Sequence, residues 1–381
     1  MRRALGWAFS NRPGEWVREG LRLTIALSNI WVDLTLQTEA YHWIQKGLGL
    51  LEAGEEDLSL RALALFFSSD GAFKENHLVA RDILEESLAL FRSSGNKIGQ
   101  IDALLTLADY IRQEDPPKAH QLADEAAALS TDIQYMWRLA LSESWMDNLL
   151  SRQGVDKVQE VLEKSQLFLK ENGMILYLLP ITTNRGHLAF SQGDAKAAQK
   201  YYQQVLDLAL ELENKFWIAV SLGSLGMVAY LRDDFRAMAA LLQDSLECFR
   251  EQDDRGSTCW ILRNLAIAAK REGNLRQADQ HYRESLSISQ ALQDDYGVFA
   301  SLAGLGGIAV AEGEELRAAR LLGAAEALFE SFTKPLDRIE QIEFERDKAA
   351  LCGHLDRDAL QAAREEGRQM TLEQALNLAC A

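Results

Sequence analysis

Histidines are the residues of this sequence whose side chains could most directly serve as proton donors, proton acceptors or metal ligands near neutral pH. None of the six forms an HxxxH or HExxH pair, the spacing that places two imidazoles on one helix face for zinc. No Ser-His-Asp set can be assigned from their scattered positions either. We therefore predict no metal site, and surface or groove positions rather than catalytic roles, for His42, His77, His120, His187, His281 and His354.

Glycine-rich and cysteine-containing segments are the next candidates for chemistry. The run Gly304-Leu305-Gly306-Gly307 lies inside a helical pattern, follows no strand and lacks the third spaced glycine of a nucleotide loop. A GxxxxGK[ST] phosphate loop is absent, and no CxxC pair occurs among Cys248, Cys259, Cys352 and Cys380. Carboxylates are plentiful, but no pair can be assigned as general acid and base. We expect no cofactor and no enzymatic activity.

The overall charge and hydropathy exclude further classes. Lys and Arg number 40 against 57 Asp and Glu, and the resulting charge of −17 would repel the phosphate backbone of a nucleic acid. The longest uncharged stretches, 216–231 and 296–311, are shorter than the roughly 20 apolar residues that span a bilayer. A signal-peptide pattern is also absent. We therefore expect a cytoplasmic protein that binds neither nucleic acid nor membrane directly.

The elements that would position any functional residue form a repeat. Turn residues recur 40 residues apart, at Gly193-Asp194, Asp233-Asp234, Gly273-Asn274 and Gly313-Glu314. Before each turn, the first helix carries a small residue at matched positions, namely Ala108, Gly186, Gly226, Ala266 and Gly306, with Asp147 as the exception. After each turn, the second helix presents one buried face through Ala198 and Tyr202, Met238 and Leu242, Ala278 and Tyr282, and Ala318 and Leu322.

This pattern predicts an all-α fold, a right-handed α-solenoid of stacked antiparallel helix pairs with about 40 residues per repeat. We divide the chain into irregular helical repeats over 1–94, regular repeats over 95–332 and a C-terminal helical cap over 333–381, in which Thr371 begins an N-cap pattern. The predicted helices are 97–112, 116–130, 134–152, 155–171, 175–192, 194–212, 215–231, 233–251, 255–271, 274–292, 296–312 and 314–332, preceded by about four helices within 15–93.

The repeat resembles the tetratricopeptide family in a long, 40-residue form. The resemblance is carried by Ser224-Leu225-Gly226, Asn264-Leu265-Ala266 and Gly304-Leu305-Gly306, each followed by a turn and, in the last two, by a central alanine, and it covers roughly 95–332. In this repeat type the first helices line the concave face. The family therefore implies a binding surface built from those helices.

Two flanking regions resemble the edges of the helical arm of STAND-class signalling ATPases, including the maltose-regulator-like transcriptional activators. One comprises 317–327 with 367–375, and the other comprises 4–8 with 20–23. In that family an NTPase region precedes the arm, and some members carry a LuxR-type DNA-binding helix-turn-helix after it. The sequence begins and stops near those borders, so the resemblance implies a sensor or scaffold arm, either as it stands or excised from a longer chain.

Two opposite charges occupy packing positions on neighbouring first helices. Asp147 stands where the repeat expects a small residue, and Arg185 stands where the next repeat expects an apolar one. An isolated charge in that layer would cost several kcal/mol. The two side chains therefore pair with each other or with a bound ligand, unless the helix register is locally shifted.

A set of cationic, amide and aromatic residues is predicted on the concave face and suits the recognition of a peptide, a sugar or an anionic metabolite. Trp260 beside Arg263 and Asn264 could stack on and hydrogen-bond a ligand, but the sequence favours the alternative, a tryptophan that bridges adjacent repeats. The predicted ligand-binding residues are Asn148, Arg152, Thr183, Asn184, Arg185, His187, Tyr230, Trp260, Arg263, Asn264 and Lys270.

We thus expect a non-catalytic arm of a STAND-type ATPase or transcriptional activator, which binds a small-molecule inducer, a peptide or a protein partner. The alternative is a free-standing scaffold that binds peptides or proteins in its concave groove. A P-loop domain encoded in the same reading frame would distinguish the arm from the scaffold.

Overall fold

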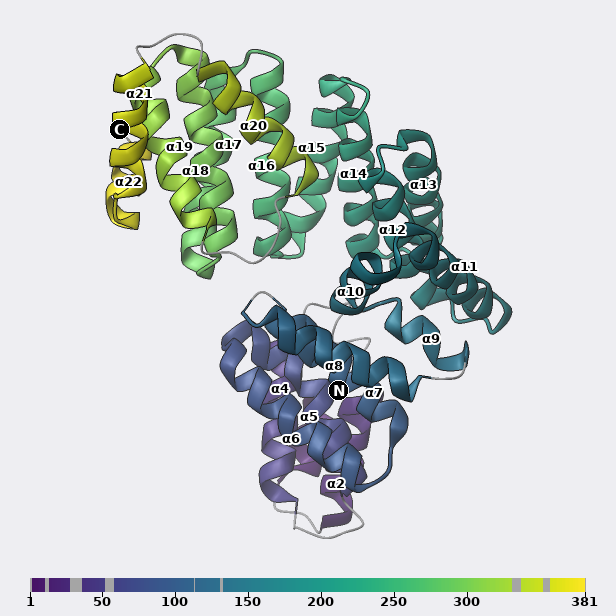
Figure 1. Cartoon of the computed structure of the whole chain (residues 1–381). Coiled ribbons are helices and arrows are strands. Elements are labelled where there is room, and N and C mark those ends of the chain that lie inside the picture. The colour runs from purple at the N-terminus through teal and green to yellow at the C-terminus, as the bar shows by residue number, and fades with distance from the viewer. Residues whose placement is uncertain are drawn as a thin grey trace. The chain divides into compact units, whose positions relative to one another are not determined.

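The computed structural model describes residues 2–10, 14–27, 36–51, 58–112, 114–130, 133–330, 337–351 and 357–380. Over these ranges the chain forms helices in stacked antiparallel pairs and contains no strand, which confirms the predicted all-α repeat fold. The chain divides into two compact units, Met1–Ile181 (unit 1) and Thr182–Ala381 (unit 2) (Figure 1). The boundaries near residues 94 and 332 describe a different division and stay a prediction.

Unit 1 contains the shorter and less regular helices. Four helices lie within the described part of residues 14–93, where about four were predicted, and their core contains the fully buried Leu21 and Ile44. The described helices of unit 1 are α1 (Arg2–Ala8), α2 (Gly14–Ala26), α4 (Gln37–Leu50), α5 (Leu58–Glu75), α6 (His77–Ser93), α7 (Lys97–Ile111), α8 (Pro116–Leu129), α9 (Ile133–Leu139), α10 (Glu143–Gln153) and α11 (Val155–Glu171), and α12 (Ile175–Ser191) continues into unit 2.

One predicted helix was wrong in its extent. Residues 134–152 form two helices, α9 and α10, instead of one. Ser142 separates them because its side-chain oxygen accepts a hydrogen bond from the backbone N–H of Trp145 at 3.3 Å and so caps α10. The same hydroxyl donates to Asp109 Oδ1 at 2.9 Å, which holds the break against α7.

Unit 2 contains the regular repeats. Helices α14 and α18 correspond to the two long uncharged stretches and are largely buried, and none of the described helices is long and apolar enough to cross a membrane. The helices of unit 2 after α12 are α13 (Ala195–Glu211), α14 (Lys215–Tyr230), α15 (Phe235–Glu251), α16 (Arg255–Arg271), α17 (Leu275–Leu292), α18 (Asp295–Glu312), α19 (Glu315–Phe329), α20 (Arg338–Leu351), α21 (Arg357–Arg368) and α22 (Leu372–Cys380).

The repeated turns end one helix and begin the next by the same local chemistry. Gly193 takes a positive φ of 79°, a conformation that glycine adopts without steric cost. Asp194 then caps α13, because its carboxylate accepts hydrogen bonds from the backbone N–H groups of Lys196 at 3.1 Å and Ala197 at 2.9 Å. Asp234 caps α15 in the same way. The 40-residue spacing of the turns therefore sets the length of each helix pair.

The small residue of each first helix permits close packing of the second helix. At Gly186 in α12, an added Cβ would lie 2.3 Å from Cε1 of Tyr202 in α13, and the Tyr202 side chain is almost fully buried. Similarly, an added Cβ at Gly226 would lie 3.0 Å from Leu242 Cγ. This explains why glycine or alanine recurs at these positions.

We expect the substitution Gly186→Ala to lower the free energy of unfolding by about 1–3 kcal/mol, because the buried Tyr202 ring must move to admit the methyl group. The matched control is Gly49→Ala in α4, where an added Cβ meets nothing within 4 Å. This control should raise the free energy of unfolding by about 0.5–1 kcal/mol through helix propensity. Urea denaturation of both variants would measure the difference, and equal stabilities would contradict the packing account.

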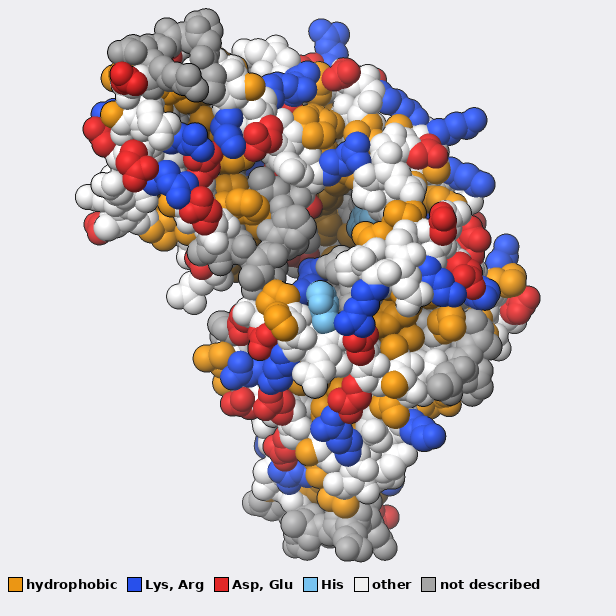
Figure 2. Space-filling view, in the orientation of Figure 1, with side chains coloured by type: hydrophobic (Ala, Val, Ile, Leu, Met, Phe, Trp, Pro, Cys, Tyr) orange, Lys and Arg blue, Asp and Glu red, His pale blue; other side chains and the backbone are white. Residues whose placement is uncertain are grey.

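Helices α21 and α22 cover the end of the repeat array at α19. The backbones of α19 and α21 approach closely, since an added Cβ at Gly367 would lie 2.0 Å from the carbonyl oxygen of Arg320. Thr371 and Gln374 exchange side-chain to backbone hydrogen bonds at 2.8 and 3.2 Å, which confirms the predicted N-cap of α22. Figure 2 shows acidic and basic side chains intermixed over these helices, as in the 2.6 Å pair of Arg368 with Glu330.

Candidate functional site

The repeats alternate a first and a second helix, but helix α20 does not continue this order. It lies across the first helices. Figure 1 shows it crossing α16 to α18. It interacts with a surface that we call the inner face, defined by Tyr230 of α14, Arg263 and Lys270 of α16, and Tyr296 and Phe299 of α18. At its N-terminal end, the Arg338 guanidinium donates to the carbonyl oxygen of Ser191 in α12. Helix α20 thus interacts with one helix from each of four successive repeats.

The side of α20 that meets the inner face is both apolar and acidic. Arg, Glu, Lys and Ala are good helix formers and make up most of its 14 residues. The buried residues recur three or four positions apart, which places them on one stripe of the helix. They are Ile339, Glu340, Glu343, Phe344, Asp347 and Leu351. Three carboxylates are therefore buried on the face where an ordinary repeat helix carries apolar residues.

The first buried ion pair joins Arg263 of α16 to Glu340 of α20. Arg263 Nε donates to Glu340 Oε1 at 2.7 Å, and the two side chains are only 5% and 9% exposed. The Tyr296 hydroxyl donates to the other carboxylate oxygen at 2.5 Å. Burial by itself would lower the pKa of Arg263, but the adjacent Glu340 carboxylate raises that pKa overall. The arginine is therefore fully charged, and its charge is balanced inside the protein.

The second buried group is centred on Lys270. Its Nζ lies 2.6 and 2.9 Å from the two carboxylate oxygens of Asp347, and 3.3 Å from Glu343 Oε2. The Tyr230 hydroxyl donates to Glu343 Oε1 at 2.7 Å, and Arg271 lies 3.4 Å from the same oxygen. Burial, reinforced by the Glu343 carboxylate, raises the pKa of Tyr230, so this hydroxyl keeps its proton and acts as a donor.

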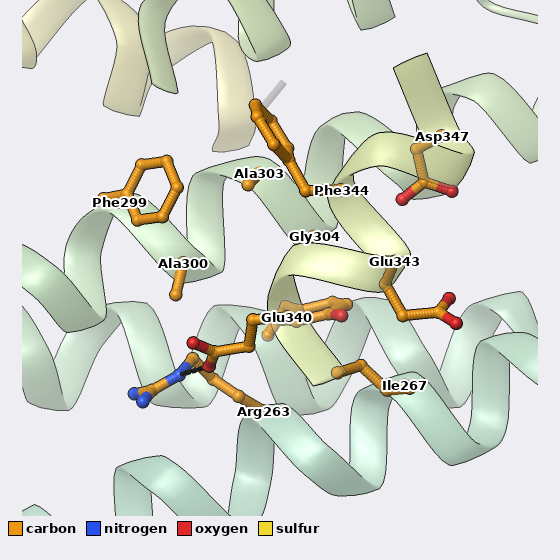
Figure 3. A pocket seen from close by; sticks show the side chains of 11 residues that line it. Arg263, Ile267, Phe299, Ala300, Ala303, Gly304, Glu340, Glu343, Phe344 and Asp347 are labelled. Atoms are coloured by element: carbon orange, nitrogen blue, oxygen red, sulfur yellow. Dashed lines mark hydrogen bonds and ion pairs between the residues drawn. The ribbon is translucent and has the colours of Figure 1, made fainter. Parts of the chain in front are cut away.

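The interface between α20 and the inner face is closely packed. Phe344 packs on Phe299 with ring centroids 6.0 Å apart, and the remaining cavity of about 20 Å³ holds at most one water molecule. Figure 3 shows Glu340, Glu343 and Asp347 projecting from successive turns of α20. Buried ion pairs contribute little net stability, because desolvation offsets their attraction, but a buried cation left without its carboxylate is strongly unfavourable. The arrangement can therefore recognise an acidic helix.

The pKa of Asp347 is raised by burial, and Lys270 only partly counteracts this effect. A raised folded-state pKa contributes stability that is fully present below the unfolded pKa and is lost as the pH rises through the folded pKa. We therefore expect the stability of the wild type relative to Asp347→Asn to increase as the pH is lowered from 7 toward 4. Paired urea titrations at several pH values measure this difference, and a difference that does not change with pH would contradict the assignment.

Three of the predicted ligand-binding residues, Tyr230, Arg263 and Lys270, come together on the inner face, where α20 already engages them. Trp260 and Asn264 are placed differently. The amide of Asn264 donates to the carbonyl oxygen of Trp260 at 2.9 Å, and the Trp260 ring lies against Gly223 of α14. Trp260 therefore bridges adjacent repeats, as the alternative interpretation of this residue proposed. Its role in ligand binding stays a prediction.

The residues predicted on α12 lie close together on one helix. Thr183 is buried, Asn184 and Arg185 are half-buried, and His187 is exposed. Arg185 donates to the Tyr201 hydroxyl at 2.8 Å, and its guanidinium lies over the Tyr201 ring at 4.5 Å. This contact with α13 gives Arg185 a packing partner within its own repeat.

The remaining predicted residues belong to unit 1. Arg152 is exposed and forms an ion pair with Asp124 at 2.8 Å. The side chains of Asp147 and Asn148 lie outside the described residues. The proposed pairing of Asp147 with Arg185 therefore stays a prediction.

Sequence reasoning did not identify the acidic residues of α20 or Tyr296. The 333–381 segment was interpreted only as a terminal cap, because acidic residues in a charged helix usually face solvent. A signal was nevertheless present in the spacing of Glu340, Glu343 and Asp347, which places all three on the same stripe as Ile339 and Phe344. In addition, no group of three or more metal-ligating side chains occurs within the described ranges.

Comparisons with known proteins agree with the repeat. Residues 177–251 and 217–291 match the Tetratricopeptide repeat family, so the segment 177–291 consists of tetratricopeptide-type repeats. No curated protein matches the sequence.

Two solved structures share the fold over most of the chain. The Rap protein complexed with competence and sporulation factor is 13% identical, with a TM-score of 0.59 over 93% of this chain and 100% of that chain. A STAND protein with a tetratricopeptide repeat sensor from Pyrococcus horikoshii is 12% identical, with a TM-score of 0.52 over 96% of this chain. The chain spans about half of that second protein, 51%. At these identities the similarity establishes the fold alone.

Proposed function

We propose that this protein is a non-catalytic regulatory arm, whose surface along the first helices, which includes the inner face, binds a protein segment or an inducer and so controls an attached or associated STAND-type ATPase or transcriptional activator. The observation that carries the proposal is the binding of α20 on the inner face through Arg263 and Lys270. A tetratricopeptide-type surface that holds one helix through buried charges is suited to recognise other helices. The fold similarity to a STAND protein with a repeat sensor supports the same role.

The second candidate is a free-standing scaffold that binds a peptide or protein. It is favoured by the similarity to the Rap protein, because this chain covers that protein over its whole length and that protein is complexed with competence and sporulation factor. The two candidates differ in whether an ATPase is attached. A P-loop domain in the same reading frame would support the arm, and a reading frame that lacks one would support the scaffold.

A thermal-shift screen of the full chain against sugars, nucleotides, amino acids and short peptides tests ligand binding. A ligand at 100 times its dissociation constant adds about 2.7 kcal/mol to the free energy of unfolding. We expect a saturable shift that is reduced in Trp260→Ala or Asn184→Ala.

Photo-cross-linking tests the binding of a protein partner. A photo-cross-linking residue replaces the exposed His187 of α12, and the matched control replaces the exposed Leu210 of α13. A flat screen together with no partner cross-linked specifically at position 187 would contradict the proposal.

A further inference from the structure

We propose that α20 is an intramolecular competitor, which occupies the inner face in place of a helix from a partner protein. The partner helix presents carboxylates at relative positions 0, 3 and 7 and an aromatic side chain at position 4. This inference rests on the proposed function and specifies its partner and its regulation. The pattern of the partner helix is derived from the contacts that α20 itself makes with the inner face.

The positions of the pattern follow from the contacts of α20. Glu340 at position 0 meets Arg263, and Glu343 at position 3 meets Lys270 and the Tyr230 hydroxyl. Phe344 at position 4 packs on the Phe299 ring. Asp347 at position 7 forms a second ion pair with Lys270. A helix with this pattern from another protein would satisfy the same buried groups.

The inner face is selective for charge because its cations are nearly inaccessible while α20 is bound. The side chains of Arg263 and Lys270 are 5% and 7% exposed. A docked helix without carboxylates would leave both cations buried and unpaired, which is strongly unfavourable. When α20 departs, water can solvate the cations of the inner face and the carboxylates of α20. The ion pairs therefore determine which helix binds more than how tightly it is held.

Competition within one chain has a measurable consequence. A tethered helix acts at a high effective concentration, on the order of millimolar for a short flexible link. The apparent dissociation constant of an external helix equals its intrinsic dissociation constant divided by the fraction of molecules in which the inner face is free. Weakening the binding of α20 should therefore strengthen the binding of an external acidic helix.

The test uses the full chain and a fluorescent synthetic peptide with the sequence of residues 337–351. Glu343→Lys in the chain places a fourth cation beside Lys270, Arg271 and Arg346 and should release α20. The matched control is Glu345→Lys, which makes the same charge change on the exposed side of the helix. We expect the Glu343→Lys chain to bind the peptide at least about tenfold more tightly than the wild type or the control. A peptide that itself carries Glu343→Lys should not bind.

A second variant distinguishes release of α20 from misfolding as the reason why a chain binds the peptide. Lys270→Glu repels the native α20, and we expect this chain to bind a peptide with Asp347→Lys, in which Glu343 still meets Arg271, but not the unmodified peptide. A chain that bound peptides only because it was unfolded would not show this reversal. The proposal is overturned if the Glu343→Lys chain binds no more tightly than Glu345→Lys, or if the charge-reversed peptide is not selected.

Light scattering of the wild-type chain tests whether the helix on the inner face belongs to the same chain or to a second copy. A monomer supports an intramolecular contact, whereas a stable dimer that exchanges α20 would overturn it. These results are separate from the test of the proposed function. Peptide exchange could fail while a partner still cross-links at position 187, and it could succeed even if no partner is found.

Discussion

In a Lys270→Met variant, helix α20 should leave the inner face. The substitution removes the cation that lies 2.6 Å from Asp347 and 3.3 Å from Glu343, and it leaves both carboxylates buried. Removing one partner of a buried ion pair costs about 3–5 kcal/mol, which is more than a 100-fold change in an equilibrium constant. Release of α20 into water avoids most of this cost, so the population of the undocked state should rise by at least about 100-fold.

Limited digestion with trypsin measures this release, because α20 contains Arg338, Arg346 and Lys348. Cleavage of a region that opens and closes rapidly follows the population of its open state. We expect cleavage within α20 to accelerate at least about 100-fold in Lys270→Met. The control is Lys215→Met, which removes an exposed lysine paired with Glu251 and should leave the cleavage rate near that of the wild type. Equal rates in both variants would show that Lys270 does not hold α20.

The substitution Phe299→Ala should lower the free energy of unfolding by about 3–5 kcal/mol. The Phe299 ring is 1% exposed and contacts the rings of Tyr296, Phe329 and Phe344, and so joins α18, α19 and α20. Its loss opens a cavity at the point where the repeat core meets α20. Urea denaturation of this variant is compared with that of Leu210→Ala, whose side chain is 54% exposed. A surface truncation of this kind should change stability by less than about 0.5 kcal/mol. Similar losses in the two variants would contradict the assignment of Phe299 to the core.

The repeat itself could be predicted from the sequence because its determinants are local. The glycine or aspartate of each turn, the capping residue after it and the small residue of each first helix recur at fixed spacing, as Gly193, Asp194 and Gly186 illustrate. Residues 134–152 were the exception. There the break depends on a hydrogen bond from Ser142 to Asp109, which lies 33 residues earlier in the chain. A local pattern cannot reveal such a contact.

The candidate site could be predicted only in part. Tyr230, Arg263 and Lys270 were assigned to the concave face from their matched positions in the first helices, and the structure brings these three together. Their occupant was missed, because Glu340 lies 77 residues beyond Arg263 and no repeat spacing relates the two. Spacing along α20 shows that its acids share a face, but only the folded chain shows that this face meets cations.

The most direct measurement of the central claim, that α20 is a separable occupant of the inner face, is native-state hydrogen exchange of the wild-type chain. Backbone amides of residues 338–351 are compared with those of α16 and α18. If α20 binds and leaves as a unit, its amides should exchange together through an opening of lower free energy than that of α16 and α18, which stay protected. If the amides of α20 exchange only at the rate at which α16 and α18 unfold, α20 is an integral part of the repeat core, and the claim is contradicted.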